Sequence, residues 1–147
     1  MTMNFTIYGK PQGKARARTF YNPKLGRSQS VTPEKTVLYE NYIKQCFLEQ
    51  SNPSERWFEK EPIKMTIIAC FEIPKSTSKK DRERIAGGKL FPTKKPDADN
   101  IAKVICDALN GVAYGDDTQI ISLTVCKVYT NGNPCVNVNL KGGKDEK

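Results

Sequence analysis

Residues 95–120 read KPDADNIAKVICDALNGVAYGDDTQI, and this stretch sets the organisation of the rest of the chain. Its apolar residues recur at helical spacing, which predicts an amphipathic helix with one buried face. They are Ile101, Val104, Ile105, Ala108 and Leu109. We expect Asp99 or Asn100 to cap the start of this helix, and Gly111 suits the left-handed conformation that often ends one.

Acidic residues flank this predicted helix on both sides. Asp97 and Asp99 lie two positions apart on chain that we expect to be extended, so their side chains point the same way. Asp116 and Asp117 open a run rich in β-forming residues. A hairpin-like return of that run would bring Asp117 back toward the first two carboxylates. Three carboxylates beside Lys103 outline a divalent-metal site, because Mg²⁺ takes oxygen ligands.

The same residues have a purely structural interpretation. Asp-X-Asp-Asn before a helix is a good N-cap, and Asp-Asp-Thr is typical of a turn. Lys103 can form a helical ion pair with Asp99 or Asp107 instead of contacting a phosphate. Asp116 is either a further ligand or a turn residue. Spacing alone leaves both interpretations open.

Composition favours a polyanionic partner. The chain has 147 residues, with 24 Lys and Arg against 16 Asp and Glu, a net charge of +8. Such a balance is typical of nucleic-acid-binding proteins. The chain has no histidine, which excludes Ser-His and Cys-His nucleophiles and one-histidine metal hydrolysis. The five cysteines are scattered without a Cys-x-x-Cys pair, so we expect buried free thiols.

Basic residues gather near the N-terminus and directly before the acidic stretch. Lys14, Arg16 and Arg18 alternate, so on extended backbone they face one side and can contact phosphates. The alternative is an edge strand that its charges protect from aggregation. The full set of candidate DNA-binding residues is Lys10, Lys14, Arg16, Arg18, Lys94 and Lys95.

The remaining pattern predicts an α+β fold in a single domain, residues 1–140, with a disordered tail at 141–147. We expect strands at 5–9, 63–73, 118–129 and 135–140, with helices at 33–50, 77–88 and 101–109. Residues 22–31 look like a mobile loop, and Asn131-Gly132 is typical of a two-residue hairpin turn. Together these elements make a small mixed sheet packed with two to three helices.

The acidic stretch also resembles a known family, the RusA-type Holliday junction resolvases, which are often carried by prophages. The resemblance lies in three segments: PDADNIAK at 96–103, DALNG at 107–111 and DDTQI at 116–120. A Pro-x-x-Lys-x-Arg segment after the first strand, residues 11–16, is similar to the start of these proteins. Ala98 stands where the family usually has leucine, and Tyr114-Gly115 precedes the acidic pair.

This resemblance implies a RusA-like fold, a homodimer and paired symmetric nicks in four-way junction DNA with Mg²⁺ or Mn²⁺. It carries the catalytic and metal-binding aspartates over to Asp97, Asp99 and Asp117, and the catalytic lysine to Lys103. We therefore expect a metal-dependent endodeoxyribonuclease that needs no small-molecule cofactor. The alternatives are a nuclease for other branched DNA and a non-catalytic DNA-binding module. The N-terminus lacks a signal-peptide pattern and no membrane-binding segment is evident, so we expect a cytoplasmic protein.

Overall fold

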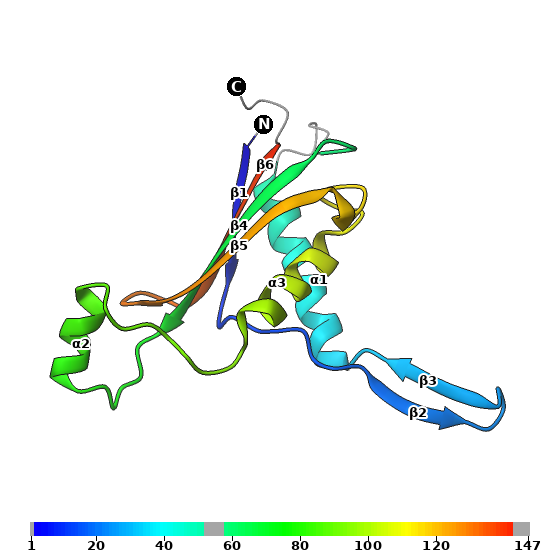
Figure 1. Cartoon of the computed structure of the whole chain (residues 1–147), viewed down its shortest axis with the longest axis horizontal. Coiled ribbons are helices and arrows are strands. Elements are labelled where there is room, and N and C mark those ends of the chain that lie inside the picture. Colours follow the sequence, from blue (N-terminus) through cyan, green and yellow to red (C-terminus); the bar gives the residue numbers. More distant parts are fainter. Residues whose placement is uncertain (1, 52–57, 143–147) are drawn as a thin grey trace.

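The computed structural model describes residues 2–51 and 58–142. Its centre is a four-stranded mixed sheet in the order β1-β6-β4-β5. These strands are β1 (Thr2–Tyr8), β4 (Ile63–Glu72), β5 (Ile120–Thr130) and β6 (Cys135–Gly142). Helices α1 (Glu34–Gln50) and α3 (Ala98–Leu109) cover one face of the sheet (Figure 1). The predicted α+β class and mixed sheet are confirmed.

The core lies between the sheet and the two helices. Alternate residues of the strands point toward the helices, and those of β1, β4 and β6 are buried there. The apolar face of α3 meets them, and Ile101, Val104 and Ile105 are fully buried. Phe5 of β1 meets Phe47 of α1 edge to face, with ring centroids 5.3 Å apart. This packing fixes the rotation of α3, so its polar residues have one possible outward direction.

The prediction that β5 and β6 form a hairpin is wrong. β6 pairs antiparallel with β1 on one side and with β4 on the other, while β5 pairs parallel to β4 at the edge. The physical reason is burial: Val136, Val138 and Leu140 of β6 are almost completely buried between neighbours. On β5, Ile121 and Leu123 stay 62% and 44% exposed. The better-covered apolar strand takes the interior position.

The prediction that residues 22–31 form a mobile loop is wrong. Strands β2 (Arg18–Asn22) and β3 (Arg27–Val31) pair antiparallel as a separate two-stranded sheet. This hairpin projects from the body of the molecule beyond the start of α1 (Figure 1). The ordered chain therefore carries an arm where sequence patterns indicated only a polar connection.

Several boundaries differ from those predicted. Helix α2 (Lys79–Ala86) begins after the N-cap Ser78, whose hydroxyl accepts a hydrogen bond from the Asp81 backbone N–H. β6 continues to Gly142, two residues into the predicted tail, and the rest of that tail lies outside the described residues. All five cysteines are free, but only Cys46 is buried and Cys126 is exposed. No helix within the described ranges is long and apolar enough to span a membrane.

Candidate active site

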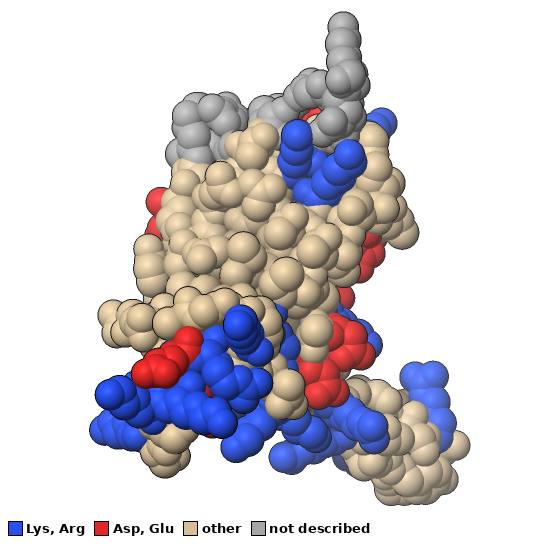
Figure 2. Space-filling model, turned by 60° about the vertical axis from the view of Figure 1, so that its left-hand side comes forward, with Lys and Arg blue, Asp and Glu red and all other residues tan. Residues whose placement is uncertain are grey.

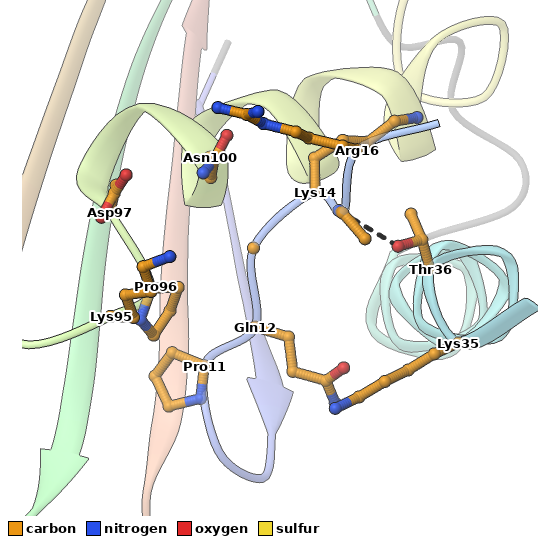
Figure 3. Close-up of a pocket in the computed structure, with 12 residues that line it drawn as sticks. Pro11, Gln12, Lys14, Arg16, Lys35, Thr36, Lys95, Pro96, Asp97 and Asn100 are labelled. Atoms are coloured by element: carbon orange, nitrogen blue, oxygen red, sulfur yellow. Dashed lines mark hydrogen bonds between the residues drawn. The ribbon is translucent and has the colours of Figure 1, made fainter. Parts of the chain in front are cut away.

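A pocket of about 550 Å³ lies where the segment after β1 crosses the beginnings of α1 and α3. Its lining includes residues 11–16 of the crossing segment, Lys35 and Thr36 of α1, and Lys95, Pro96, Asp97 and Asn100 at the start of α3. Figure 3 shows Lys35 and Gln12 approaching one another from opposite sides. Most charged groups here are positive, so the pocket suits an anion.

The crossing segment is held tightly against α3. The Lys14 backbone N–H donates to the Asn100 carbonyl at 3.0 Å, and the Ala15 N–H donates to the buried Thr36 hydroxyl at 3.2 Å. Gly13 allows the approach, because a Cβ there would lie 2.9 Å from the Asn100 Cβ. The glycine in the sequence PQGKAR thus positions one wall of the pocket.

Two helix N-termini contribute to this pocket. A helix N-terminus carries partial positive charge and unpaired N–H groups, and both attract phosphate-like anions. Asp97 is the N-cap of α3, but its side chain makes no capping hydrogen bond. The expected cap at Asp99 or Asn100 is wrong, since both residues lie inside the helix. Asp97 therefore keeps its carboxylate available at the edge of a basic pocket.

The expectation that Asp97 and Asp99 share an extended segment is wrong. Only Asp97 has extended backbone, while Asp99 lies in the first turn of α3. Residues two apart on a helix face different directions. The two carboxylates are close in sequence, but they point in different directions because one residue is extended and the other is helical.

Lys14 is not the phosphate donor that the alternating pattern indicated. Its Nζ lies 2.9 Å from Glu40 Oε2 and 3.0 Å from Asp107 Oδ2, and its side chain is only 19% exposed. Desolvation lowers the pKa of Lys14, but hydrogen bonds to Glu40 and Asp107 outweigh it and raise the pKa above 10.5. The charged amine therefore joins α1 to α3. Asp107 pairs with Lys14 and not with Lys103 within the described chain.

A second acidic group forms beyond the other end of α3. The carboxyl groups of Asp116 and Asp117 hydrogen-bond each other, which raises the pKa of Asp117 and lowers that of Asp116. The negative charge of Asp107 also raises the pKa of Asp117. Burial, then the charges of Asp117 and Asp107, raises the pKa of the Cys106 thiol to about 11. Asp117 therefore lies near Asp107, whereas the sequence pattern predicted that it returns toward Asp97 and Asp99.

The predicted convergence of Asp97, Asp99 and Asp117 is not formed. No group of three or more Asp, Glu or Cys side chains within residues 2–51 and 58–142 is placed to hold one metal ion. Asp97 stands at the start of α3, and Asp117 interacts with Asp107 near the end of that helix. Asp97 and Asp107 are about 15 Å apart along the helix axis, since each residue of an α-helix rises about 1.5 Å. The oxygen donors suit Mg²⁺ chemically, but their spacing does not make one closed site.

Gln119 holds the acidic pair in place, and sequence patterns gave it no role beyond the family motif. Its Oε1 accepts the backbone N–H groups of Gly115 and Asp116, both at 2.9 Å. Its Nε2 donates to the carbonyls of Phe58 and Glu61 at 3.0 and 2.9 Å. These four bonds tie the turn before β5 to the chain that leads into β4.

The remaining candidate residues lie on one end of the molecule. Lys103 is exposed and makes no ion pair with Asp99 within the described part of the chain. Lys10 and Lys95 line a neighbouring pocket of about 400 Å³, while Arg16 lines the first. The Lys94 carbonyl accepts a 2.6 Å hydrogen bond from the Lys127 amine. Figure 2 shows most of the visible Lys and Arg gathered at the end that carries α2 and the arm, with a few Asp and Glu among them and a smaller basic group near the opposite end.

Comparison with known proteins finds similar sequences along nearly the whole chain. The family model described as endodeoxyribonuclease RusA matches residues 8–141. A protein of Bacillus subtilis (strain 168), described as "Uncharacterized protein YqaN", is 33% identical over 141 residues. That alignment covers 95% of each chain. Both matches include the acidic stretch and the segment that crosses α3.

Proposed function

Because the chain belongs to the endodeoxyribonuclease RusA family, we propose that it is a metal-dependent endonuclease that resolves Holliday junctions in the cytoplasm. Resolution would proceed by paired symmetric nicks during DNA recombination and repair. The observation that carries the proposal is the Asp97 carboxylate, which makes no capping hydrogen bond and lines a basic pocket. Asp97 lies within the stretch that the family match covers.

The proposed roles follow from where each side chain lies. Arg16 and Lys95 line the pocket and hold the DNA backbone there, helped by the N-termini of α1 and α3. Lys103 is exposed four residues after Asp99, and it stabilises charge on the phosphate that is cut. Lys14 has a different role, because its amine is already paired with two carboxylates.

Asp97, Asp99 and Asp117 are the proposed ligands of Mg²⁺, which Mn²⁺ can replace. When bound, the ion neutralises the phosphodiester and lowers the pKa of the attacking water. The separation of the carboxylates in this structure means that they must move closer together on DNA and metal. The hydrogen bond to Asp116, and then the negative charges of Asp116 and Asp107, raise the pKa of Asp117, and a bound cation would relieve the repulsion between these charges.

Cleavage of a labelled four-way junction, beside linear and flap DNA, tests the proposal. We expect paired nicks on the junction with Mg²⁺ and none with EDTA. Equal cutting of flaps would instead indicate a nuclease for branched DNA in general. Junction binding without any cutting, with either metal, would leave a DNA-binding protein whose aspartates are architectural.

Replacing one proposed ligand separates catalysis from folding. Asp99→Asn should abolish cleavage yet keep or tighten junction binding, because it removes a charge that repels phosphate. Glu83→Gln is the matched control, since Glu83 is exposed on α2 and has no proposed role. A variant that cuts normally, or one that loses binding with a large fall in melting temperature, contradicts the metal-ligand role of Asp99.

A further inference from the structure

The arm formed by β2 and β3, residues 18–31, has no role in the site described above. Its strands pair only with each other and project from the body (Figure 1). Nearly all its residues are exposed, with Asn22 and Gln29 half-buried. An isolated two-stranded hairpin is marginally stable in water, so an arm that buries no core needs another explanation.

Its apolar side chains have no place in the core. Phe20 and Tyr21 are 47% and 64% exposed, and Leu25 and Val31 are exposed to a similar degree. In the pairing register, Phe20 stands opposite Gln29 and Arg18 stands opposite Val31. Residues directly opposite each other point to the same face of an antiparallel pair. Because Arg18 and Phe20 are two apart on β2, Phe20 and Val31 share one face of the arm as diagonal neighbours.

That face is also positively charged. Arg18 and Phe20 are two apart on β2, and Arg27 lies opposite Asn22, so both arginines share the face with Phe20. Asn22 Nδ2 donates to Gln29 Oε1 at 3.0 Å, which places a pair of amides beside Arg27 on the same face. Residues 1–33 include six Lys and Arg but no Asp or Glu. The arm thus combines uniform positive charge, amide donors and an exposed aromatic ring.

We propose that the arm is a second DNA-binding element, which enters the groove of a duplex arm outside the site at α3. The proposal rests on the proposed function only in taking DNA as the partner. A major groove about 12 Å wide admits a two-stranded ribbon. Strands of five residues, about 17 Å long, suit contacts with phosphates on both sides.

Chain connectivity supports this placement. Arg16 lines the pocket, and β2 begins two residues later at Arg18. DNA held at the pocket therefore continues directly along the arm. The arginines contact backbone phosphates or guanine edges, and Phe20 and Val31 provide apolar contact with thymine methyl groups.

Charge-removal variants test the arm with linear duplex DNA, measured over a series of salt concentrations. Arg27→Gln should weaken binding and reduce the slope of log K against log salt by about 0.9, the value for one lost phosphate contact. Arg18→Gln with Arg27→Gln should reduce it by about 1.8. Lys60→Gln removes the same single charge from an exposed residue away from the arm and should leave the slope unchanged. Circular dichroism checks that each variant folds.

Cleavage of the four-way junction by the same variants distinguishes the two proposals. If the double variant matches Lys60→Gln in duplex affinity and salt slope while the wild-type protein resolves junctions, the arm proposal falls and the proposed function stands. If the wild-type protein cuts no DNA but the double variant still loses duplex affinity, the arm proposal stands alone.

Discussion

At the residue scale, Gln119 uses every hydrogen-bonding position of its side-chain amide. Two backbone N–H groups donate to its oxygen, and its nitrogen donates to two carbonyls. An amide has no more capacity than this. The side chain therefore fixes the turn that carries Asp116 and Asp117, although it touches neither carboxylate in these contacts.

Gln119→Glu should lower both stability and cleavage. The substitution keeps the shape but replaces the NH₂ donor with a second oxygen against the carbonyls of Phe58 and Glu61. Each lost bond of this kind costs about 1–3 kcal/mol. We expect a lower denaturant midpoint and a fall in kcat, measured beside the amide-to-acid control Asn41→Asp on the exposed side of α1. Equal midpoints for the two variants would show that the amide does not hold the turn.

Gly13 acts through the space it leaves. A Cβ at this position would lie 2.9 Å from the Asn100 Cβ and 3.1 Å from the Pro96 Cβ. Gly13→Ala should therefore push the crossing segment away from α3 and destabilise the protein by about 1–3 kcal/mol. Gly132→Ala is the control, because its new Cβ would meet only the Thr130 hydroxyl at 3.7 Å. Thermal unfolding of both variants measures the difference, and equal melting temperatures would contradict the close approach.

At the scale of elements, Lys14 joins three parts of the chain. It belongs to the segment after β1 and pairs with Glu40 of α1 and Asp107 of α3. The raised pKa of Lys14 means that folding stabilises its charged form. That contribution is fully present below pH 10.5 and is lost as the pH rises through the higher pKa of the folded state. The bridge is therefore intact at neutral pH.

Lys14→Met should destabilise the protein by about 1–3 kcal/mol, because two partly buried carboxylates lose their shared counter-charge. Adding Glu40→Gln and Asp107→Asn should restore much of the loss, since no unpaired charge then remains. Lys60→Met controls for the change in net charge. Denaturant unfolding at neutral pH measures all three proteins. If Lys14→Met is as stable as the control, the bridge contributes nothing.

At the scale of the whole molecule, charge and apolar surface are separated. Lys and Arg gather at the end that carries α2, the pocket and the arm (Figure 2). Elsewhere, the edge strand β5 exposes Ile121 and Leu123, and its outer edge pairs with no strand in the described chain. An open strand edge with apolar side chains is suited to another copy of the chain.

Paired nicks require two active sites, so we expect a homodimer. Light scattering should give twice the chain mass of 16.5 kDa, and Leu123→Lys should shift the protein toward monomer if β5 forms the contact. Such a monomer should make single nicks in place of paired ones. A wild-type protein that is monomeric both free and on junction DNA would contradict the paired mechanism.

Local pattern alone determined much of this protein. The apolar stripe of α3, the alternation in β4 and the charged helix α2 appear where they were predicted, because neighbouring residues set helical and strand periodicity. The family motif at 96–120 could also be identified from the sequence, since its residues are close together along the chain. These features depend on contacts within a few residues.

Only the tertiary structure decided which distant segments meet. It placed β6 between β1 and β4, paired β2 with β3 and turned Lys14 inward to two carboxylates. It also put Asp117 near Asp107 and left Asp97 at the other end of α3. Burial selects these partners across long stretches of chain, and a short repeating pattern does not encode that choice.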